Sequence, residues 1–288
     1  MGGADRASCD AIIIDIRQTR RRVSYRERFT SCFTIIDFSL PITFIQSNYL
    51  IDYCPGSSRK MSTNGEIPEI ILRTRSAASG VTGESVEPRQ ILQDEERAPD
   101  PSKSIPLPPN RQRLVDDIMA LYACEPTIER VSRYAPACVY DDQFVYANDR
   151  YKMAAQWYGL PKLFPKSECM GLQIVRNDPT LIQWKYQQRW YFYGTSKTVE
   201  PYAFVSLVLD EATKDSDFPL VLYHKDQGNH KDYSHQGIGF WFKKVQADNV
   251  PKLMSNPEME LFKGDANAAK EAVKTYGSGT NAPKSEVA

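Results

Sequence analysis

The side chains best suited to acid–base chemistry include a histidine and an aspartate near the end of this 288-residue chain. His224 and Asp226 stand two residues apart in an apolar segment that begins at Leu220, which is typical of a strand. Alternate residues of a strand point the same way, so both are expected to face the interior. The sequence predicts His224 as a general base whose ring Asp226 orients. A hydrogen-bonded core histidine is the alternative.

A second pair of carboxylates, Asp141 and Asp142, follows a short predicted strand from Ala137 to Tyr140. Only one of two adjacent strand residues can face an interior, and alternation does not decide which. We take Asp142 as the candidate. A carboxyl group among aromatic rings has a raised pKa and can shuttle a proton. The alternative is that the pair caps the following turn.

Aromatic side chains could line a pocket for a flat apolar ligand around these groups. The predicted strand at 180–194 alternates, and its apolar face includes Gln188, a buried amide that needs hydrogen-bond partners. The predicted ligand-binding residues are Tyr140, Tyr158, Tyr186, Gln188, Trp190, Tyr202 and Phe240. Of these, Tyr140, Tyr158 or Tyr186 would donate a hydrogen bond to a developing oxyanion. Aromatic stripes are also typical of a filled core.

The histidines also raise the question of a metal site. His224, His230 and His235 are the three histidines of the chain, with Asp226 and Asp232 between them, but their spacing matches no known ligand motif. No two of the six cysteines have the C-x-x-C spacing of structural zinc sites. Glycine-rich phosphate loops and G-x-S-x-G are absent from the sequence. We therefore predict neither a metal nor a cofactor.

Charge and hydropathy limit the classes of partner. The chain has 36 basic and 36 acidic side chains and a formal net charge of +0, which does not favour nucleic acid or an anionic membrane as a partner of the whole chain. Polar residues interrupt the apolar stretch at 29–53, so no run of about twenty apolar residues could span a bilayer. We predict a cytoplasmic protein, with the nucleus as an alternative location.

Composition divides the chain into segments, because aromatic residues gather in its middle. We predict one folded domain over 110–260. Residues 1–60 are expected to be an upstream extension before a start at Met61, or a targeting-like segment. Residues 61–109 are rich in Ser and Pro and are predicted to be a disordered linker. Residues 261–288 are predicted to be a flexible tail.

Within the predicted domain, helices come first and strands follow. Capping residues predict helices from Asn110, Thr127 and Asn148, with a short strand before the third helix. The later strands are predicted at 168–176, 180–194, 199–209, 219–227 and 234–246. The strand at 199–209 is apolar on both faces. We therefore expect one face to line the interior and the other to form a homodimer.

This order of elements resembles that of the nuclear transport factor 2-like superfamily, including its SnoaL-like branch and fungal and plant members without an assigned activity. The landmarks are the helix at 111–124, the segment from Tyr134 to Asp142, the helix from Asn148, and the strand ending at Asp226. The resemblance covers about residues 110–255. It implies an α+β fold in which a curved antiparallel sheet wraps the N-terminal helices into a cone.

The resemblance also implies an apolar pocket for a small hydrophobic ligand. The expected activity is that of a cofactor-independent lyase, isomerase or cyclase acting on a small cyclic carbonyl or enol compound. The superfamily also includes non-catalytic members, because this fold does not determine function. A dimerisation or protein-interaction module is therefore the alternative.

Overall fold

The structure, a computed structural model, describes residues 66–83, 95–229, 237–254 and 256–269, with the backbone alone for 237–240. These residues belong to one compact unit within Ser62–Ala288. The predictions for residues 1–60, His230 and His235 lie outside the described residues.

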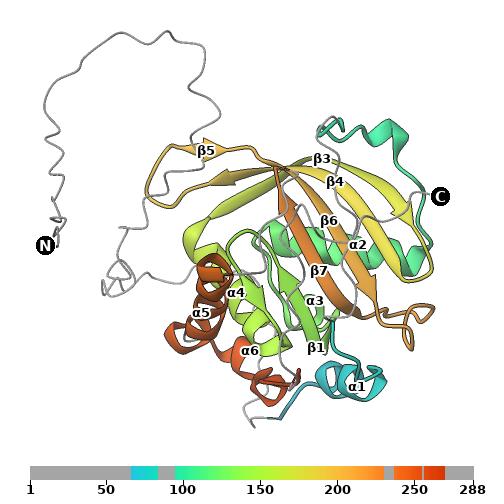
Figure 1. Cartoon of the computed structure of the whole chain (residues 1–288), viewed down its shortest axis with the longest axis vertical. Helices are drawn as coiled ribbons and strands as arrows, with labels where there is room; N and C mark the ends of the chain where they lie inside the picture. Colours follow the sequence, from blue (N-terminus) through green and yellow to red (C-terminus); the bar gives the residue numbers. More distant parts are fainter. Residues whose placement is uncertain (1–65, 84–94, 230–236, 255, 270–288) are drawn as a thin grey trace, which may run out of the picture. The chain divides into compact units, whose positions relative to one another are not determined.

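A curved sheet forms one side of the domain (Figure 1). Its strands are β1 (Tyr134–Asp141), β2 (Tyr146–Ala147), β3 (Lys166–Asn177), β4 (Leu181–Tyr191), β5 (Thr198–Val199), β6 (Tyr202–Leu209) and β7 (Val221–Gly228). They lie in the order β2-β1-β7-β6-β4-β3, and β5 pairs with β4. The pairs are antiparallel except β1 and β7, which run parallel because the chain between them crosses the domain through a helix and the other strands. The curved sheet that was predicted to be antiparallel is therefore mixed, with one parallel pair.

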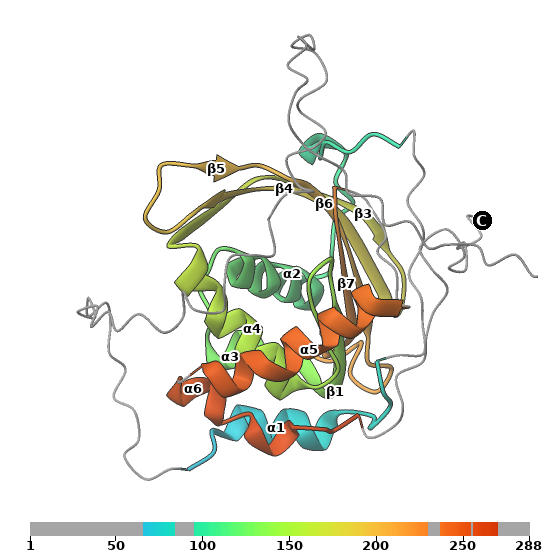
Figure 2. The ribbon, with the colours of Figure 1, turned by 60° about the vertical axis from the view of Figure 1, so that its left-hand side comes forward.

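The helices lie mainly on the concave side of the sheet, which arches over α2 and α4 (Figure 2). They are α1 (Glu69–Ala77), α2 (Pro109–Tyr122), α3 (Ile128–Val131), α4 (Arg150–Leu163), α5 (Gly237–Leu253) and α6 (Pro257–Glu260), with 3₁₀ turns at Pro101–Lys103 and Lys263–Asp265. The α+β class and the cone-like arrangement are confirmed. Within the described part of the chain, no helix is both long and apolar enough to cross a membrane.

Side-chain caps explain where two of these helices begin. Thr127 accepts a hydrogen bond from the backbone N–H of Arg130 at 3.2 Å and caps α3 as predicted. Asp149, rather than the predicted Asn148, caps α4 by accepting from the N–H of Lys152 at 2.8 Å. The two candidates are neighbours, so the helix begins one residue later than predicted.

The strand predicted at 234–246 is wrong, because helix α5 occupies most of that range. A short apolar run does not by itself distinguish a strand from a buried helix. Further along α5, Ala247 is buried and Val250 packs against the same core, at helical spacing. The side chain of Phe240, a predicted ligand residue, lies outside the described part of the structure.

The inner face of the sheet is made of rows of side chains that run across β4, β6 and β7. Trp184 of β4 pairs with Val205 of β6, which pairs with Asp226 of β7. One step along, Leu207 pairs with His224. Both candidate acid–base residues therefore lie in rows that include members of the main apolar core.

The two faces of β6 differ from the prediction. Val205 and Leu207 belong to the core, which places Tyr202 and Phe204 on the outer face of the sheet. The prediction that Tyr202 lines the pocket is therefore wrong. The homodimer prediction assumed an exposed outer face, whereas Phe204 and Ser206 are 0% exposed in the single chain. The homodimer remains a prediction, to be tested by light scattering.

Both flanks of the predicted domain contain ordered structure. Ile71 of α1 and Phe262 near the C-terminal end are 0% exposed and belong to the main core. The prediction of disorder for 61–109 and of a flexible tail for 261–288 is therefore wrong for the described parts of both ranges. Average composition predicts disorder poorly here, because a few well-placed apolar residues anchor each segment.

A buried arginine, Arg150, connects these flanks to the domain. Its Nε donates to Asp265 Oδ2 at 2.8 Å, and its Nη1 donates to Thr74 Oγ1 at 2.7 Å and to the carbonyl oxygen of Tyr134 at 3.0 Å. Arg75 Nε donates to the other oxygen of Asp265 at 2.6 Å. Arg150 therefore joins α1, β1, α4 and the C-terminal segment.

A chain that begins at residue 84 is therefore expected not to fold cooperatively, whereas one that begins at residue 62 should fold. The shorter chain lacks Ile71 and leaves Arg150 without Thr74. Losing one large buried aliphatic side chain costs about 2–5 kcal/mol, which is a large part of a typical total stability of about 5–15 kcal/mol. Thermal unfolding followed by circular dichroism compares the two chains. A sharp transition at the same temperature for both would contradict this expectation.

Candidate acid–base site

The carboxyl group of Asp226 is the centre of a polar cluster inside the cone. Its Oδ2 accepts hydrogen bonds from the hydroxyl groups of Tyr122 at 2.8 Å and Tyr186 at 3.0 Å. Its Oδ1 is buried and has no hydrogen-bond partner among the described residues. One oxygen is thus held in place, and the other is available to accept a proton.

The surroundings of Asp226 change its acidity. Burial raises the pKa of Asp226 to about 7, the nearby charge of Asp142 adds to the rise, and the hydroxyl groups of Tyr122 and Tyr186 oppose it. Burial, together with the charge of Asp226, holds the pKa of both tyrosines well above the usual value. Both tyrosines therefore stay protonated as donors, while Asp226 can exchange its proton near neutral pH.

His224 lies between two tyrosine hydroxyl groups. Tyr134 Oη is 2.8 Å from Nδ1, and Tyr122 Oη is 3.0 Å from Nε2. The single hydroxyl proton of Tyr122 is donated to Asp226, so Tyr122 can only accept from the ring. We therefore assign the ring proton to Nε2, which leaves Nδ1 to accept from Tyr134.

This arrangement differs from the predicted one, in which Asp226 orients His224 as the base. Both ring nitrogens are already engaged, and burial lowers the pKa of His224 to about 3, so the ring stays neutral. The ring is linked to Asp226 through the hydroxyl of Tyr122. Leu220 and Leu222, which precede His224 in the same apolar segment, pack in a separate apolar cluster.

Asp141 and Asp142 have different partners. Asp141 is buried, pairs with a lysine of α5 and accepts from the hydroxyl of Tyr223 at 3.1 Å. Asp142 accepts from the hydroxyl of Tyr140 at 2.9 Å and from the backbone N–H groups of residues 144–145 at 2.6 Å. Asp142 thus caps the turn and also acts on Asp226, and burial raises its pKa.

Aromatic rings pack around these polar groups. The ring centroid of Tyr122 lies 5.1 Å from that of Tyr186 and 5.2 Å from that of Trp157. The ring of Tyr140 lies 5.4 Å from Trp157 and 4.9 Å from His224. The structure therefore brings together the predicted residues Tyr140 and Tyr186, and it adds Tyr122 and Trp157.

The remaining predicted ligand residues lie at different places. Trp190 is partly exposed, with its ring 6.5 Å from that of Tyr122. Gln188 is 0% exposed and its amide lies next to the backbone of Tyr122. Tyr158 of α4 is near Glu258 of α6; burial and that charge raise its pKa. Within the described residues, none of the hydrogen bonds of the polar cluster includes Tyr158.

Sequence reasoning did not single out Tyr122 and Tyr134 for the site. Tyr122 ends the apolar face of the helix predicted from Asn110, and a buried tyrosine hydroxyl needs a hydrogen-bond partner. That requirement was the available signal. It could not identify the partners, because His224 is 102 residues from Tyr122 and 90 residues from Tyr134.

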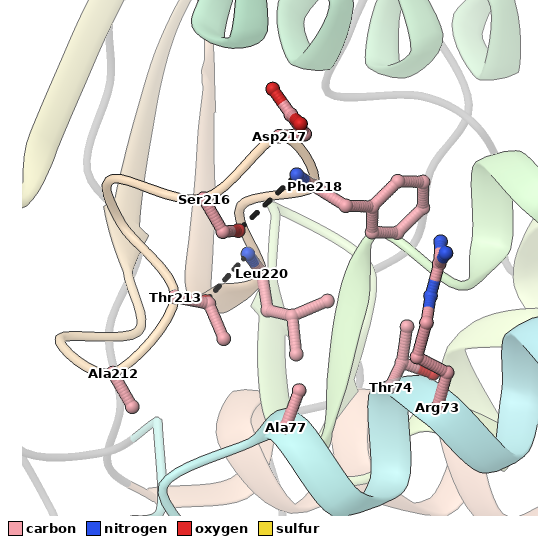
Figure 3. Close-up of a pocket in the computed structure, with 9 residues that line it drawn as sticks. All are labelled: Arg73, Thr74, Ala77, Ala212, Thr213, Ser216, Asp217, Phe218 and Leu220. Carbon is pink, nitrogen blue, oxygen red and sulfur yellow. Dashed lines mark hydrogen bonds between the residues drawn. The ribbon is translucent and has the colours of Figure 1, made fainter.

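A cavity of about 500 Å³ lies elsewhere, between α1 and the loop that joins β6 to β7 (Figure 3). Its lining residues are Arg73, Thr74, Ala77, Ala212, Thr213, Ser216, Asp217, Phe218 and Leu220. Two of its hydroxyl groups already serve the chain: Thr213 accepts from the N–H of Leu220 at 3.0 Å, and Ser216 accepts from the N–H of Phe218 at 3.2 Å. None of the predicted site residues lines this cavity, so we do not assign the acid–base site to it.

Neither metal ligands nor an activated thiol were found among the described side chains. No group of three or more His, Cys, Asp or Glu residues in that part of the chain is placed to hold a metal ion. Burial raises the pKa of Cys124 to about 11 and also raises those of Cys138 and Cys169. These thiols therefore remain protonated at neutral pH.

No family model and no curated protein match this chain. Solved structures do. An NTF2-like protein from Anabaena variabilis is 9% identical over 41% of this chain and 86% of its own, with a TM-score of 0.35. An LEH-like epoxide hydrolase of M. tuberculosis is 12% identical over 41% and 82%, with a TM-score of 0.32. A de novo designed protein with a curved β-sheet is 11% identical over 50% and 98%, with a TM-score of 0.32.

Similarity of this degree carries no information about activity. The chain is similar to these proteins in the arrangement of a curved sheet over helices. The strands and helices of this chain define its fold class. Asp226 and the tyrosines that donate to it define the candidate site.

The raised pKa of Asp226 predicts a specific pH dependence of stability. An aspartate in an unfolded chain titrates near 3.9, whereas Asp226 in the fold titrates at about 7. Between these values the unfolded chain has released this proton and the native protein still holds it. Raising the pH from about 4 to about 7 therefore lowers the free energy of unfolding, and below about 4 the effect vanishes.

Thermal denaturation of the wild type and of Asp226→Asn, at about pH 5 and about pH 8, tests this expectation. The wild type should lose more thermal stability than the variant between the two pH values. The comparison isolates Asp226, because the other titrating groups are common to both proteins. Equal losses in both proteins would contradict a raised pKa at this residue.

Proposed function

We propose that this domain is an acid–base enzyme that moves a proton next to the carbonyl group of a small, hydrophobic, cyclic compound. One observation supports this proposal above the others. Asp226 has a pKa of about 7, with one oxygen held by Tyr122 and Tyr186 and the other without a partner among the described residues. A carboxyl group of this kind has the acidity that a general base needs at neutral pH.

In the proposed reaction, Oδ1 of Asp226 takes a proton from the carbon next to the carbonyl. The electron pair of that C–H bond forms a carbon–carbon double bond, and the carbonyl oxygen becomes an oxyanion. Neutral Asp226 then holds Tyr186 less strongly, so the hydroxyl of Tyr186 can turn toward the oxyanion. If a second double bond is conjugated with the enolate, returning the proton to its far carbon gives an isomerase. If the carbon next to the enolate carries a hydroxyl, using the proton to expel that hydroxyl as water gives a dehydratase.

Two further residues support this reaction without meeting the substrate. His224 donates from Nε2 to the oxygen of Tyr122, which fixes the direction of the hydroxyl of Tyr122 toward Asp226. Asp142 raises the pKa of Asp226 through its charge. The aromatic enclosure excludes water and so strengthens each of these electrostatic interactions.

The test uses the full chain with 1-tetralone, a flat cyclic ketone, in D₂O. Proton NMR follows the loss of the signal from the carbon next to the carbonyl. We expect the protein to accelerate this exchange over buffer and over the same protein after heat denaturation. If neither this ketone nor cyclohexenone exchanges faster with the protein than without it, the proposal fails.

The second candidate function is a non-catalytic module that binds a small ligand or a protein partner. It is favoured by the close packing of the interior, where Tyr122 and Tyr186 are 2% and 3% exposed, and by the position of the described cavity outside the cone. Ligand-induced thermal stabilisation without proton exchange would support binding alone. Neither exchange nor stabilisation would support the interaction module.

A further inference from the structure

Gln188 carries another buried oxygen without a partner. The side chain is 0% exposed and lies on β4, two residues after Tyr186 and therefore on the same face. Its Nε2 donates to Ser167 Oγ at 2.6 Å and lies 3.4 Å from the backbone carbonyl oxygen of Tyr122. A carbonyl can only accept, so it fixes which end of the amide is nitrogen. Oε1 is left without a partner among the described residues.

An unsatisfied buried amide oxygen is unfavourable, because it has lost its hydrogen bonds to water. A leucine at this position would occupy a similar volume without that cost. Tyr186 and Trp190, the neighbours of Gln188 on this face, are aromatic and show that the face otherwise suits apolar side chains. Such an oxygen is explained by a hydrogen-bond donor that arrives with a ligand, or by an ordered water molecule.

Tyr122 contacts both Gln188 and Asp226. Its backbone oxygen lies 3.4 Å from Nε2 of Gln188, and its hydroxyl oxygen lies 2.8 Å from Oδ2 of Asp226. The two side chains therefore contact opposite ends of one tyrosine residue. A ligand that reaches both has the size of one or two fused rings.

We infer that Gln188 accepts a hydrogen bond from a hydroxyl group of the substrate, at the end of the molecule opposite the reacting carbon. This inference rests on the proposed function, because it takes Asp226 as the group that meets the reacting carbon. The substrate class is then a flat, hydroxylated cyclic ketone. The donor is a neutral hydroxyl rather than an ammonium group, because a buried amide oxygen offers a dipole and no charge to balance a cation.

The test compares two probes, 1-tetralone and 7-hydroxy-1-tetralone, which differ by one hydroxyl group. A phenol ordinarily titrates near 10, so the added group is a donor at neutral pH. Binding to the full chain is measured by isothermal titration calorimetry. We expect the wild type to bind the hydroxylated probe about 5- to 10-fold more tightly, as one net hydrogen bond implies. We expect Gln188→Leu to bind both probes equally.

Control variants separate this inference from the proposed function. Asp226→Asn should slow proton exchange about 10²–10⁴-fold and keep the preference for the hydroxylated probe, whereas Gln188→Leu should lose the preference. Gln188→Met, which has a similar length, is made in parallel in case the leucine variant does not fold. Circular dichroism checks the fold of each variant.

Equal affinities of the wild type for the two probes would overturn the inference and indicate that Oε1 binds only a structural water. A preference that persists in both Gln188 variants would also overturn it, since another group would then be the acceptor. A third outcome separates the two proposals. If the wild type prefers the hydroxylated probe, Gln188→Leu shows no preference, and the wild type exchanges no proton, then the role of Gln188 stands and the proposed reaction fails.

Discussion

Replacing Asp226 with Asn should lower the rate of proton exchange from 1-tetralone about 10²–10⁴-fold, the usual effect of removing a positioned general base. Asparagine keeps the shape of the side chain and an oxygen that can accept from Tyr122 and Tyr186, but it cannot take up a proton. The fold should therefore remain intact. Proton NMR in D₂O at about pH 8, where Asp226 is ionised in the wild type, measures the two rates.

His224→Gln is the informative comparison. If His224 acts only by holding Tyr122, this variant should lose less activity than Asp226→Asn and should retain the same dependence on pH. The rate of the wild type should rise with pH through about 7, as Asp226 loses its proton. A larger loss in His224→Gln than in Asp226→Asn would return the role of base to the histidine and reject our assignment.

Asp265→Ala is expected to give a large loss of stability, about 3–5 kcal/mol, because it leaves the buried guanidinium group of Arg150 without its anion. The same change removes the partner of Arg75. Urea denaturation of the two proteins measures the difference in the free energy of unfolding. A midpoint within experimental error of that of the wild type would contradict the role given to this ion pair.

Arg75→Gln provides the matched control for that prediction. Its side chain is 24% exposed, whereas that of Arg150 is 0% exposed, so water can replace part of what is lost. Its effect on stability should therefore be much smaller. Replacing Arg150 and Asp265 together by Met and Leu should recover part of the loss, because neither charge is then buried alone.

Local patterns predicted the parts of the fold that depend on neighbouring residues. The alternation of β4 correctly placed Gln188 on the inner face, and Thr127 caps a helix as expected. The two faces of β6 are both apolar, so alternation could not say that Tyr202 faces outward. The apolar run before Ala247 was compatible with either a strand or a helix.

The candidate site shows a different limit of sequence reasoning. The sequence correctly placed His224 and Asp226 in the interior, but it assigned the role of base to His224, which our proposal gives to Asp226. Acidity depends on burial and on partners, and Tyr122 and Tyr134 come from elements far away in the chain. Without those contacts, the unperturbed pKa favoured histidine as the base.

The ordered flanks could not be predicted for a related reason. Disorder was inferred from the composition of a whole segment, which says nothing about where a single side chain docks. Ile71 enters the core, and Asp265 meets an arginine that lies 115 residues away in sequence. Long-range pairs of this kind leave no local pattern.

The central claim is that Asp226 exchanges its proton near neutral pH. Carbon NMR of the full chain labelled at the aspartate carboxyl carbon measures this property directly, and the Asp226→Asn spectrum assigns the signal. We expect that signal to titrate at about 7. A midpoint near 3.9, the value of an ordinary aspartate, would show a carboxylate that is too weak a base for the proposed role and would contradict the account.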